Sequence, residues 1–407
     1  MYDHVIVGGG ISGLYMYTQL LKKTNNILLL EKNQYLGGRI YQHHEDNIQF
    51  PGGAARFNKN HTHVIQLLKD FDLLDFRKDK GIGSSIDFID CKNEFMSKFK
   101  KKNGFIYIKK VLKSVENLKT TYHLRNYTFS EYAKKCLTKN ELDFMLKASG
   151  YSGQLKHMNM HDAYFLFKNG IRDDITFYAG YYHLLIEKMV AHLRKNKANL
   201  KINSDVQSIT FDNVQENYVL KYQNKTVKTK NIILCIPQPA LLKLDILEPI
   251  HYLLKNSVNC KPLCRVYAQF KKEDVWFQNI GKTVTNNALR YIIPMDAEKG
   301  LIMISYTDDI YTKFWENQNI NSKKCKEKVV KLVKQTFGLT INEPVKMWKF
   351  YWDCGVAYWK KGVHSEEISD YLTNPIQNIY ICGENYSLTQ SWVEGSLESC
   401  EKALSCI

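Results

Sequence analysis

Three short stretches near the amino terminus follow the hydrophobic patterns of a strand, a helix and a second strand. Residues 5–7 form an apolar run, residues 11–23 place apolar side chains on one side of a helix, and residues 27–30 are apolar again. Short continuous apolar runs are typical of strands that are buried on both faces. We therefore predict a β-α-β unit, the first unit of a doubly wound parallel sheet.

The same patterns predict further elements along the chain. Residues 61–71 have helical spacing, and strand patterns return at 204–211, 218–223 and 231–241. Residues 378–404 have the pattern of a strand, a loop and a helix. Strand and helix signals of the same kind therefore occur at both ends of the chain and in its middle.

No low-complexity linker divides the 407 residues into consecutive parts. A chain of this length forms about two domains, and the distribution of strand patterns indicates that they are interleaved. We predict an α/β protein in which a Rossmann-like domain is interleaved with an α+β substrate domain that acts as a cap. The first domain is predicted from residues 1–75, 200–245 and 370–407, and the second from residues 76–199 and 246–369.

The turn between the first strand and the helix has the spacing G-x-G-x-x-G. Its glycines are Gly8, Gly10 and Gly13, and Glu31 follows the second strand. The first glycine permits a tight turn, the second lets the backbone approach a pyrophosphate, and the third lets the helix pack closely against the strand. The carboxylate can accept a hydrogen bond from a ribose hydroxyl. This arrangement predicts a dinucleotide site, with the phosphates at the positive end of the helix.

A second glycine-rich turn follows the predicted ribose carboxylate. Gly37, Gly38 and Arg39 lie in the stretch EKNQYLGGRI, residues 31–40. A second turn that carries a guanidinium suits a ligand longer than the first turn can hold. A nicotinamide-binding domain has no obvious need of it, so the second turn favours another dinucleotide.

With these motifs the chain resembles the flavin-dependent amine oxidase superfamily, which includes monoamine, polyamine and L-amino acid oxidases. The resemblance rests on VIVGGGISGL and EKNQYLGGRI near the start, and on ICGENYS and SWVEGSLES near the end. It implies the FAD-binding fold of amine oxidases and FAD as the cofactor. It also implies hydride transfer from the C–H bond beside the amine to flavin N5, followed by reoxidation by dioxygen to hydrogen peroxide.

The resemblance assigns cofactor-binding residues at matching positions. The two glycine turns would hold the diphosphate, the ribose and the approach to the flavin, and FPGGAARFNKNH (50–61) resembles the segment beside the isoalloxazine ring. The backbone of Val206 would meet the adenine, and Gly383 and Glu384 the ribitol and phosphate. The implied cofactor-binding residues are Gly8, Gly10, Ile11, Ser12, Gly13, Glu31, Lys32, Gly38, Arg39, Gly53, Ala54, Ala55, Arg56, Val206, Gly383, Glu384, Trp392 and Val393.

Trp392 and Val393 match the amino terminus of the last helix of the family. Amides and the helix dipole at such a position can stabilise negative charge on the pyrimidine end of the flavin. Trp392 would also form one side of an aromatic cage for the amine, although core packing is the alternative for a large aromatic residue. Gly355 stands where the family has a second cage residue, so Tyr358 or Trp359 would fill that side.

Two positions depart from the family pattern. Arg265, in PLCRVYAQFKKEDVW, stands where many members place a lysine against flavin N5 through a water. An arginine keeps the charge but does not act as a proton acceptor; it either orients water or a substrate carboxylate, or it is a structural replacement. Cys354 stands where monoamine oxidases carry a cysteine bonded to the flavin, but we expect non-covalent FAD. The predicted catalytic residues are Arg265, Trp392, Tyr358 and Trp359, and no metal is predicted.

Three functions remain open at this point. We favour an FAD enzyme that oxidises a primary or secondary amine, with a polyamine or an amino acid as the candidate substrate. The second is a flavin enzyme of the same fold that acts on a non-amine substrate, such as a porphyrinogen or polyene, or uses an acceptor other than dioxygen. Arg265 and the incomplete cage favour this second function. The third is a catalytically weak flavoprotein with a binding role.

Composition and charge limit the partners and the location. The net charge is +16 and lysines cluster at 98–102, 109–110 and 323–326, but no nucleic-acid-binding motif accompanies them, so solvated surface is favoured over nucleic acid. No apolar run long enough to span a membrane and no sorting signal are present, so we predict no membrane attachment and a cytoplasmic location. We expect reduced cysteines, a small-molecule amine and dioxygen as partners, and leave a homodimer open.

Overall fold

The computed structural model describes residues 1–76, 87–95, 99, 103–170 and 176–407. The chain forms two compact units, of which unit 1 contains residues 1–77, 178–260 and 356–407, and unit 2 contains residues 78–177 and 261–355. Each unit is therefore assembled from segments that are distant in the sequence. Helix α8 (Tyr182–Lys195), which the sequence analysis assigns to the substrate domain, belongs to unit 1.

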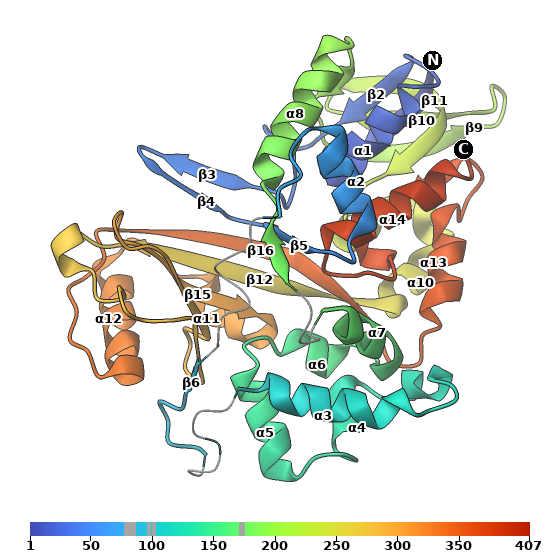
Figure 1. The fold of residues 1–407 in the computed structure, drawn as a ribbon. Helices are drawn as coiled ribbons and strands as arrows, with labels where there is room; N and C mark the ends of the chain where they lie inside the picture. Colours follow the sequence, from blue (N-terminus) through green and yellow to red (C-terminus); the bar gives the residue numbers. More distant parts are fainter. Residues whose placement is uncertain (77–86, 96–98, 100–102, 171–175) are drawn as a thin grey trace. The chain divides into compact units, whose positions relative to one another are not determined.

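Unit 1 is built on a seven-stranded sheet with the order β8-β2-β1-β11-β10-β9, in which β17 also pairs with β11 (Figure 1). The strands β8, β2, β1, β11 and β17 run parallel, whereas β10 and β9 are antiparallel to their neighbours. The bounds are β1 Tyr2–Val7, β2 Ile27–Leu30, β8 Asn199–Lys201, β9 Val206–Asp212, β10 Asn217–Tyr222, β11 Lys225–Leu234 and β17 Ile379–Ile381.

The parallel strands of this sheet end together at one edge. Their last residues, Val7, Leu30, Leu234 and Ile381, lie in register across β1, β2, β11 and β17. Ligands of open α/β sheets bind outside the carboxyl ends of the strands. The fold thus brings the first glycine turn, Glu31 and the segment after β17 to the edge at which a ligand is expected.

Helix α1 of unit 1 packs against both α8 and α14, and α14 also contacts α2 (Figure 1). The apolar positions that predicted the first helix, among them Leu14, Tyr17 and Leu20, are fully buried in one core with Ile6 and Leu29 of the sheet. Burial of such side chains contributes about 1.5–3 kcal/mol each. The bounds are α1 Ile11–Leu20, α2 Thr62–Asp70, α9 Gln238–Leu241, α10 His251–Ser257, α13 Ser365–Thr373 and α14 Val393–Leu404; two small sheets pair β3 Gln42–Glu45 with β4 Ile48–Pro51, and β5 Arg56–Asn58 with β7 Phe177–Ala179.

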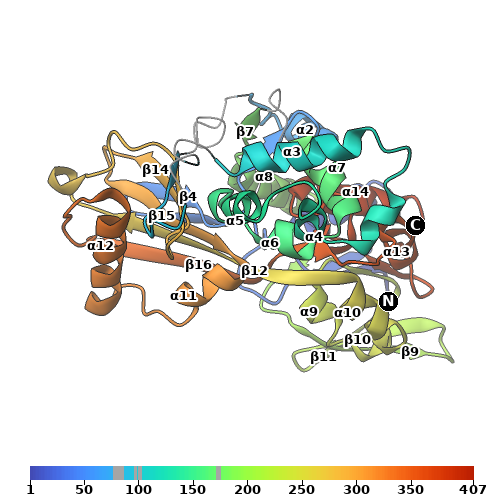
Figure 2. The ribbon, with the colours of Figure 1, turned by 90° about the horizontal axis from the view of Figure 1, so that it is seen from below.

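The second sheet, to which most of unit 2's strand residues belong, has the order β16-β12-β15-β14-β13-β6. Helix α12 packs on it through Val329 and Val333, which share a core with Val266 and Ile304. Helices α3 to α7 form a helical group, and α5 also contacts β13 of this sheet (Figure 2). The bounds are β6 Asp87–Ile89, β12 Val258–Gln269, β13 Thr283–Thr285, β14 Tyr291–Asp296, β15 Leu301–Asp308, β16 Lys346–Trp359, α3 Phe105–Glu116, α4 Phe129–Ala133, α5 Lys139–Ala148, α6 Gly153–His157, α7 Met160–Gly170, α11 Lys313–Glu316 and α12 Lys323–Phe337.

The predicted β-α-β unit is present, although α1 ends at Leu20 and not at residue 23. The strand predicted over 231–241 ends at Leu234, and α9 begins at Gln238. Pro237 is the N-cap residue of α9, and its fixed φ suits the start of a helix, so the strand does not continue to residue 241. The prediction of a Rossmann-like fold is otherwise confirmed by the parallel sheet.

Two further expectations can be compared with the structure. Cys260 and Cys354 are disulfide-bonded, whereas the other eight cysteines are free. The expectation of reduced cysteines is wrong for these two, because scattered spacing does not reveal which cysteines come close enough to bond.

Among the described residues, no helix is long and apolar enough to cross a membrane. Lys98 and residues 100–102 of the first lysine cluster lie outside the described residues.

Candidate cofactor site

The first glycine turn contains two kinds of glycine. A Cβ atom on Gly8 would lie 2.4 Å from the carbonyl oxygen of Cys235, and one on Gly13 would lie 1.9 Å from the carbonyl oxygen of Gly8. The chain's own packing therefore requires both glycines. A Cβ atom on Gly10 would meet no atom within 4 Å. Internal packing does not require this glycine, and its open side is where a ligand can approach the backbone closely.

Helix α1 begins directly after this turn with its first amides available. Gly10 is the N-cap residue, no side chain caps the helix, and its first turn holds no acidic residue. The first amides of a helix have no partner within the helix and carry partial positive charge. Ile11 and Ser12 thus lie at an anion site of the kind that binds diphosphates.

Glu31 is buried at the end of β2 and is held against the glycine turn. Its Oε2 accepts a hydrogen bond from the Gly9 amide at 2.6 Å, and its Oε1 accepts one from the Asn33 amide at 2.8 Å. Each carboxylate oxygen has a second lone pair, so Glu31 can also accept a hydrogen bond from a ribose hydroxyl. The neighbouring Lys32 is exposed.

The second glycine turn lies against the first. The Gly37 amide donates a hydrogen bond to the carbonyl oxygen of Gly9 at 2.8 Å, and Gly37 forms a parallel bridge with Gly10. Gly38 has a φ of 58°, and a Cβ atom there would lie 3.2 Å from the Cα atom of Gly10. The second turn therefore extends the surface of the first.

Arg39 and Glu384 form an ion pair with 2.6 Å between Nη1 and Oε1. The buried Glu384 carboxylate also accepts hydrogen bonds from the Asn385 side chain at 2.7 Å and from the Ser391 amide at 3.0 Å. The family pattern assigns Arg39 and Glu384 to the cofactor separately, whereas the structure shows them bound to each other. Glu384 thus fixes both Arg39 and the turn before α14. The preceding Gly383 has open space where a Cβ atom would lie.

Residues 53–56 run beside the second glycine turn. A Cβ atom on Gly53 would lie 1.8 Å from the carbonyl oxygen of Arg39, which accepts a hydrogen bond from the Ala54 amide at 3.0 Å. Arg56 begins β5 and Val206 begins β9, both half-buried. The predicted cofactor-binding residues therefore all belong to unit 1.

The amino terminus of α14 meets a histidine that the sequence analysis did not single out. Trp392 is the N-cap residue, Val393 is the first helical residue, and no side chain caps the helix. The Trp392 ring contacts the ring of His61 edge to face, with 4.8 Å between centroids. His61 is 5% exposed, and its Nδ1 has no hydrogen-bond partner within the described part of the chain; the same holds for the buried Oγ of Ser391.

Glu394 joins α14 to α2. Its carboxylate accepts hydrogen bonds from the amides of His63 at 3.0 Å and Val64 at 2.9 Å, and from the hydroxyl of Thr62 at 3.4 Å. An acidic residue in the first turn of α14 would normally offset that helix's positive end. The carboxylate binds the amides of α2 and does not cap its own helix, and no other side chain caps α14.

The predicted cage residues Tyr358 and Trp359 are buried at the end of β16. The Trp359 indole N–H donates a hydrogen bond to the carbonyl oxygen of Ser387 at 3.0 Å, and its amide donates one to the side chain of Gln390 at 2.8 Å. Trp359 has no exposed surface, so its packing anchors the loop before α14. A role of either residue in contacting substrate remains a prediction.

Arg265 and Cys354, the two departures from the family pattern, belong to unit 2. The Arg265 guanidinium lies over the ring of Tyr306, 4.6 Å from its centroid, and donates a hydrogen bond to its hydroxyl at 3.4 Å. The residue is buried. Cys354 is disulfide-bonded, so its sulfur is not available for a bond to a flavin.

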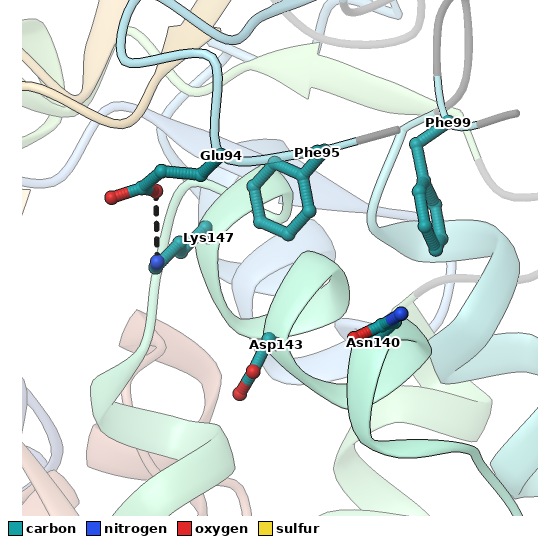
Figure 3. A pocket seen from close by; sticks show the side chains of 6 residues that line it. All are labelled: Glu94, Phe95, Phe99, Asn140, Asp143 and Lys147. Atoms are coloured by element: carbon teal, nitrogen blue, oxygen red, sulfur yellow. Dashed lines mark hydrogen bonds and ion pairs between the residues drawn. The ribbon is translucent and has the colours of Figure 1, made fainter. Parts of the chain in front are cut away.

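Unit 2 also contains a small pocket of about 100 Å³ (Figure 3). Typical small-molecule pockets enclose about 300–1,000 Å³, so this one is too small for a cofactor. Lys147 and Glu94 form an ion pair across it at 2.8 Å. The lining residues are Glu94, Phe95, Phe99, Asn140, Asp143 and Lys147, none of which belongs to the predicted site.

The parallel sheet, the glycine turn and the buried carboxylate define a dinucleotide-binding α/β protein. The family model for flavin-containing amine oxidoreductases matches residues 11–403, and the chain belongs to this family. An uncharacterized protein of Acanthamoeba polyphaga mimivirus is 23% identical over 99% of this chain and 93% of its own length. Putrescine oxidase with bound putrescine has a TM-score of 0.74 at 14% identity, over 100% of this chain and 98% of its own. Cyclohexylamine oxidase from Brevibacterium oxydans has a TM-score of 0.72 at 15% identity with the same coverage.

Family membership makes the cofactor a flavin, and the diphosphate-binding turn identifies it as the dinucleotide FAD. The residues present fit this group: the open side of Gly10 and the amides that open α1 suit a diphosphate. Glu31 suits the ribose, and the open side of Gly383 leaves room along the same edge. The predicted family, fold class and cofactor are therefore confirmed.

The burial of His61 predicts a pH dependence of stability. Burial lowers the pKa of His61 from the ordinary 6.5 to about 4, so the folded protein resists a proton that the unfolded chain binds below pH 6.5. The contribution of the neutral His61 to the free energy of unfolding is fully present above pH 6.5. It is lost as the pH falls toward 4, which lowers the free energy of unfolding by on the order of 3 kcal/mol. We expect the free energy of unfolding of the apoprotein, from urea titrations, to fall more steeply over this range than in His61→Phe. Parallel profiles would contradict the assignment.

Proposed function

We propose that the protein oxidises a small-molecule amine, with FAD as the hydride acceptor and dioxygen as the final oxidant. The observation that carries this proposal is the open side of Gly10, in the first glycine turn of a chain that belongs to the flavin-containing amine oxidoreductase family. Two solved structures with this fold are named for amine substrates, putrescine and cyclohexylamine. A polyamine or an amino acid is the candidate substrate class. Cytoplasmic location and a homodimer stay predictions.

The residues of the chain position the cofactor and adjust its charge. When bound, FAD would supply a two-electron acceptor for the hydride from the carbon beside the amine nitrogen, with dioxygen as the oxidant that would take up those two electrons and two protons as hydrogen peroxide. Glu31 binds the ribose, and the amides of Ile11 and Ser12 bind the diphosphate. The amide of Val393, at the positive end of α14, would stabilise negative charge on the flavin if its pyrimidine end lies there, as the family resemblance implies. Trp392 excludes water there and orients the amine.

An anaerobic titration of the purified holoprotein with a panel of amines tests this function. We expect one class of amine, as its neutral base, to bleach the flavin absorbance without air. Admission of air should then restore the absorbance and release one hydrogen peroxide per flavin. Alcohols and hydroxy acids of similar size serve as the matched controls. A flavin that dithionite reduces but that no amine reduces would contradict amine oxidation.

Arg265 favours a second candidate, a flavin enzyme with another substrate or another electron acceptor. Its guanidinium is held against Tyr306, and an arginine does not accept a proton near neutral pH. Bleaching by an amine without peroxide release in air would support another acceptor. If neither amines nor other reducing substrates bleach the flavin of the purified protein, the third candidate, a catalytically weak flavoprotein with a binding role, would be favoured.

A further inference from the structure

The helical group of α3 to α7 carries a large share of the positive charge of the chain. Residues 103–170 contain eleven lysines and arginines but only five acidic residues. Three of these acids are bound within the group, because Glu131 and Glu141 cap α4 and α5 and a neighbouring amide side chain binds Asp162. The group therefore presents a surplus of cations. Without a nucleic-acid-binding motif, such lysines indicate only a solvated surface.

The structure adds aromatic rings to these cations. Arg125 belongs to the short helix η2 (Tyr122–Asn126), and its guanidinium lies over the ring of Tyr122, 4.7 Å from the centroid. The Lys168 ammonium lies over the ring of Tyr164, 5.5 Å from its centroid. Cations and aromatic rings on one surface are typical of proteins that bind single-stranded nucleic acid.

Four rings of the helical group form one continuous row, which we call the aromatic row: Tyr122, His161, Phe165 and Tyr164. Tyr122 stacks on His161 with 5.5 Å between centroids, and His161 meets Phe165 edge to face at 5.1 Å. Phe165 in turn contacts Tyr164 at 5.3 Å. Tyr122 is 65% exposed and Phe165 is 46% exposed. Contiguous exposed rings of this kind mark a surface that binds a partner.

The open side of Tyr122 is defined by the neighbours of its ring. The Arg125 guanidinium donates a hydrogen bond to Nε2 of His161 at 2.9 Å, so these two groups cover the same side of the Tyr122 ring. A hydrogen bond of 2.8 Å between Nδ1 of His161 and the hydroxyl of Thr121 holds the imidazole in place. The exposed area of Tyr122 therefore belongs to its other side, which is a flat platform on which a planar group can stack.

We propose that the aromatic row binds single-stranded nucleic acid, with bases stacked on Tyr122 and Phe165 and backbone phosphates paired with the exposed Lys119 and Lys168. Charge complementarity selects this partner, because a chain with a net charge of +16 attracts an anionic polymer. A second copy of the chain carries the same charge and is repelled. A lipid surface attracts lysines but offers no planar group to the open side of Tyr122.

Fluorescence anisotropy of short labelled oligo(dT) and oligo(U) with the purified protein tests this proposal for both kinds of strand. We expect Tyr122→Ala and Phe165→Ala each to weaken binding at least about fivefold, the value of one lost base–aromatic stack. Tyr122→Phe keeps the ring and should bind like the wild type. Lys119→Gln should lower the affinity and reduce the slope of log affinity against log salt by about 0.7, the value for one phosphate contact of a single strand.

Tyr252→Ala and Lys255→Gln are the matched controls, because they change an exposed tyrosine and an exposed lysine on α10 of unit 1. Neither should alter the affinity or the salt slope, and circular dichroism verifies that every variant is folded. Failure of both oligonucleotides to bind at low salt would overturn the proposal. Binding that depends on Lys119 but on neither ring would also overturn it, because charge alone would then account for the affinity.

Two other partners are tested in the same way. Binding to phosphatidylserine vesicles but to neither oligonucleotide would overturn the proposal in favour of a lipid surface. A concentration-dependent dimer that Tyr122→Ala abolishes, without oligonucleotide binding, would overturn it in favour of a second copy. Because these measurements use no amine, failure of nucleic-acid binding is distinct from failure of amine oxidation.

Discussion

Replacing Gly10 with valine is expected to leave the apoprotein folded while weakening FAD binding at least about a hundredfold, or about 2.7 kcal/mol. A Cβ atom at this position meets no protein atom within 4 Å, so the side chain fits the apoprotein. Its φ is −73°, which any residue adopts. The added methyl groups occupy the surface over which a diphosphate must lie. Thermal unfolding of the apoprotein and fluorescence titration with FAD measure the two effects separately.

Gly13→Ala is the matched control, because it changes a glycine of the same turn for the opposite reason. Its Cβ atom would lie 1.9 Å from the carbonyl oxygen of Gly8, a backbone atom that cannot move away alone. We expect it to destabilise the apoprotein by on the order of 3 kcal/mol, the upper range for overpacking. If both variants lost stability equally, or if both bound FAD like the wild type, the division of the glycines into packing and ligand-facing positions would be wrong.

The second large effect is expected from Glu394→Ala. The carboxylate is buried and binds two amides and a hydroxyl at the start of α2. Hydrogen bonds to charged groups contribute about 1.5–3 kcal/mol each, and their loss leaves buried donors unsatisfied. We expect the free energy of unfolding to fall by about 3 kcal/mol in the alanine variant and by about 1 kcal/mol in Glu394→Gln, which keeps an acceptor. Denaturant titration of the apoprotein measures both values.

Glu327→Ala provides the control for Glu394, because Glu327 is an exposed acidic residue on α12. Surface substitutions of this kind stay within about 0.5 kcal/mol. Equal effects of the two alanine variants would mean that the contacts of Glu394 add nothing beyond an ordinary surface charge. A normal stability with weakened FAD binding would instead place the carboxylate on the cofactor.

The hydrophobic pattern and the glycine spacing of a short stretch were enough to predict the β-α-β unit that carries the first glycine turn. The β-α-β unit, the glycine spacing and Glu31 are all contained within about thirty consecutive residues, and each depends on short-range packing. The final strand and helix, β17 and α14, were also predicted from their own apolar patterns. The strand expected over 231–241 ends at Leu234, and a short helix capped by Pro237 takes the place of its second half.

Contacts between distant segments could not be predicted in the same way. Glu394 lies in the predicted last helix, but the residues next to it in the sequence do not show that its partners are the amides of α2. The pairing of Arg39 with Glu384 and the contact of His61 with Trp392 likewise join residues from opposite ends of the chain. Burial lowers the pKa of His61 in NKNH to about 4 and leaves its Nδ1 without a hydrogen-bond partner among the described residues. Such properties arise only when the sheet brings these segments together.

The visible spectrum of the purified protein, before and after acid precipitation, shows whether the chain binds FAD and whether the bond is covalent. We predict a flavin spectrum with one FAD per chain, released entirely into the acid supernatant, since Cys354 is disulfide-bonded and cannot hold the flavin. Gly10→Val, purified in parallel, should be folded and colourless. Flavin that stays in the pellet, or a colourless wild-type protein that does not take up added FAD, would contradict the account.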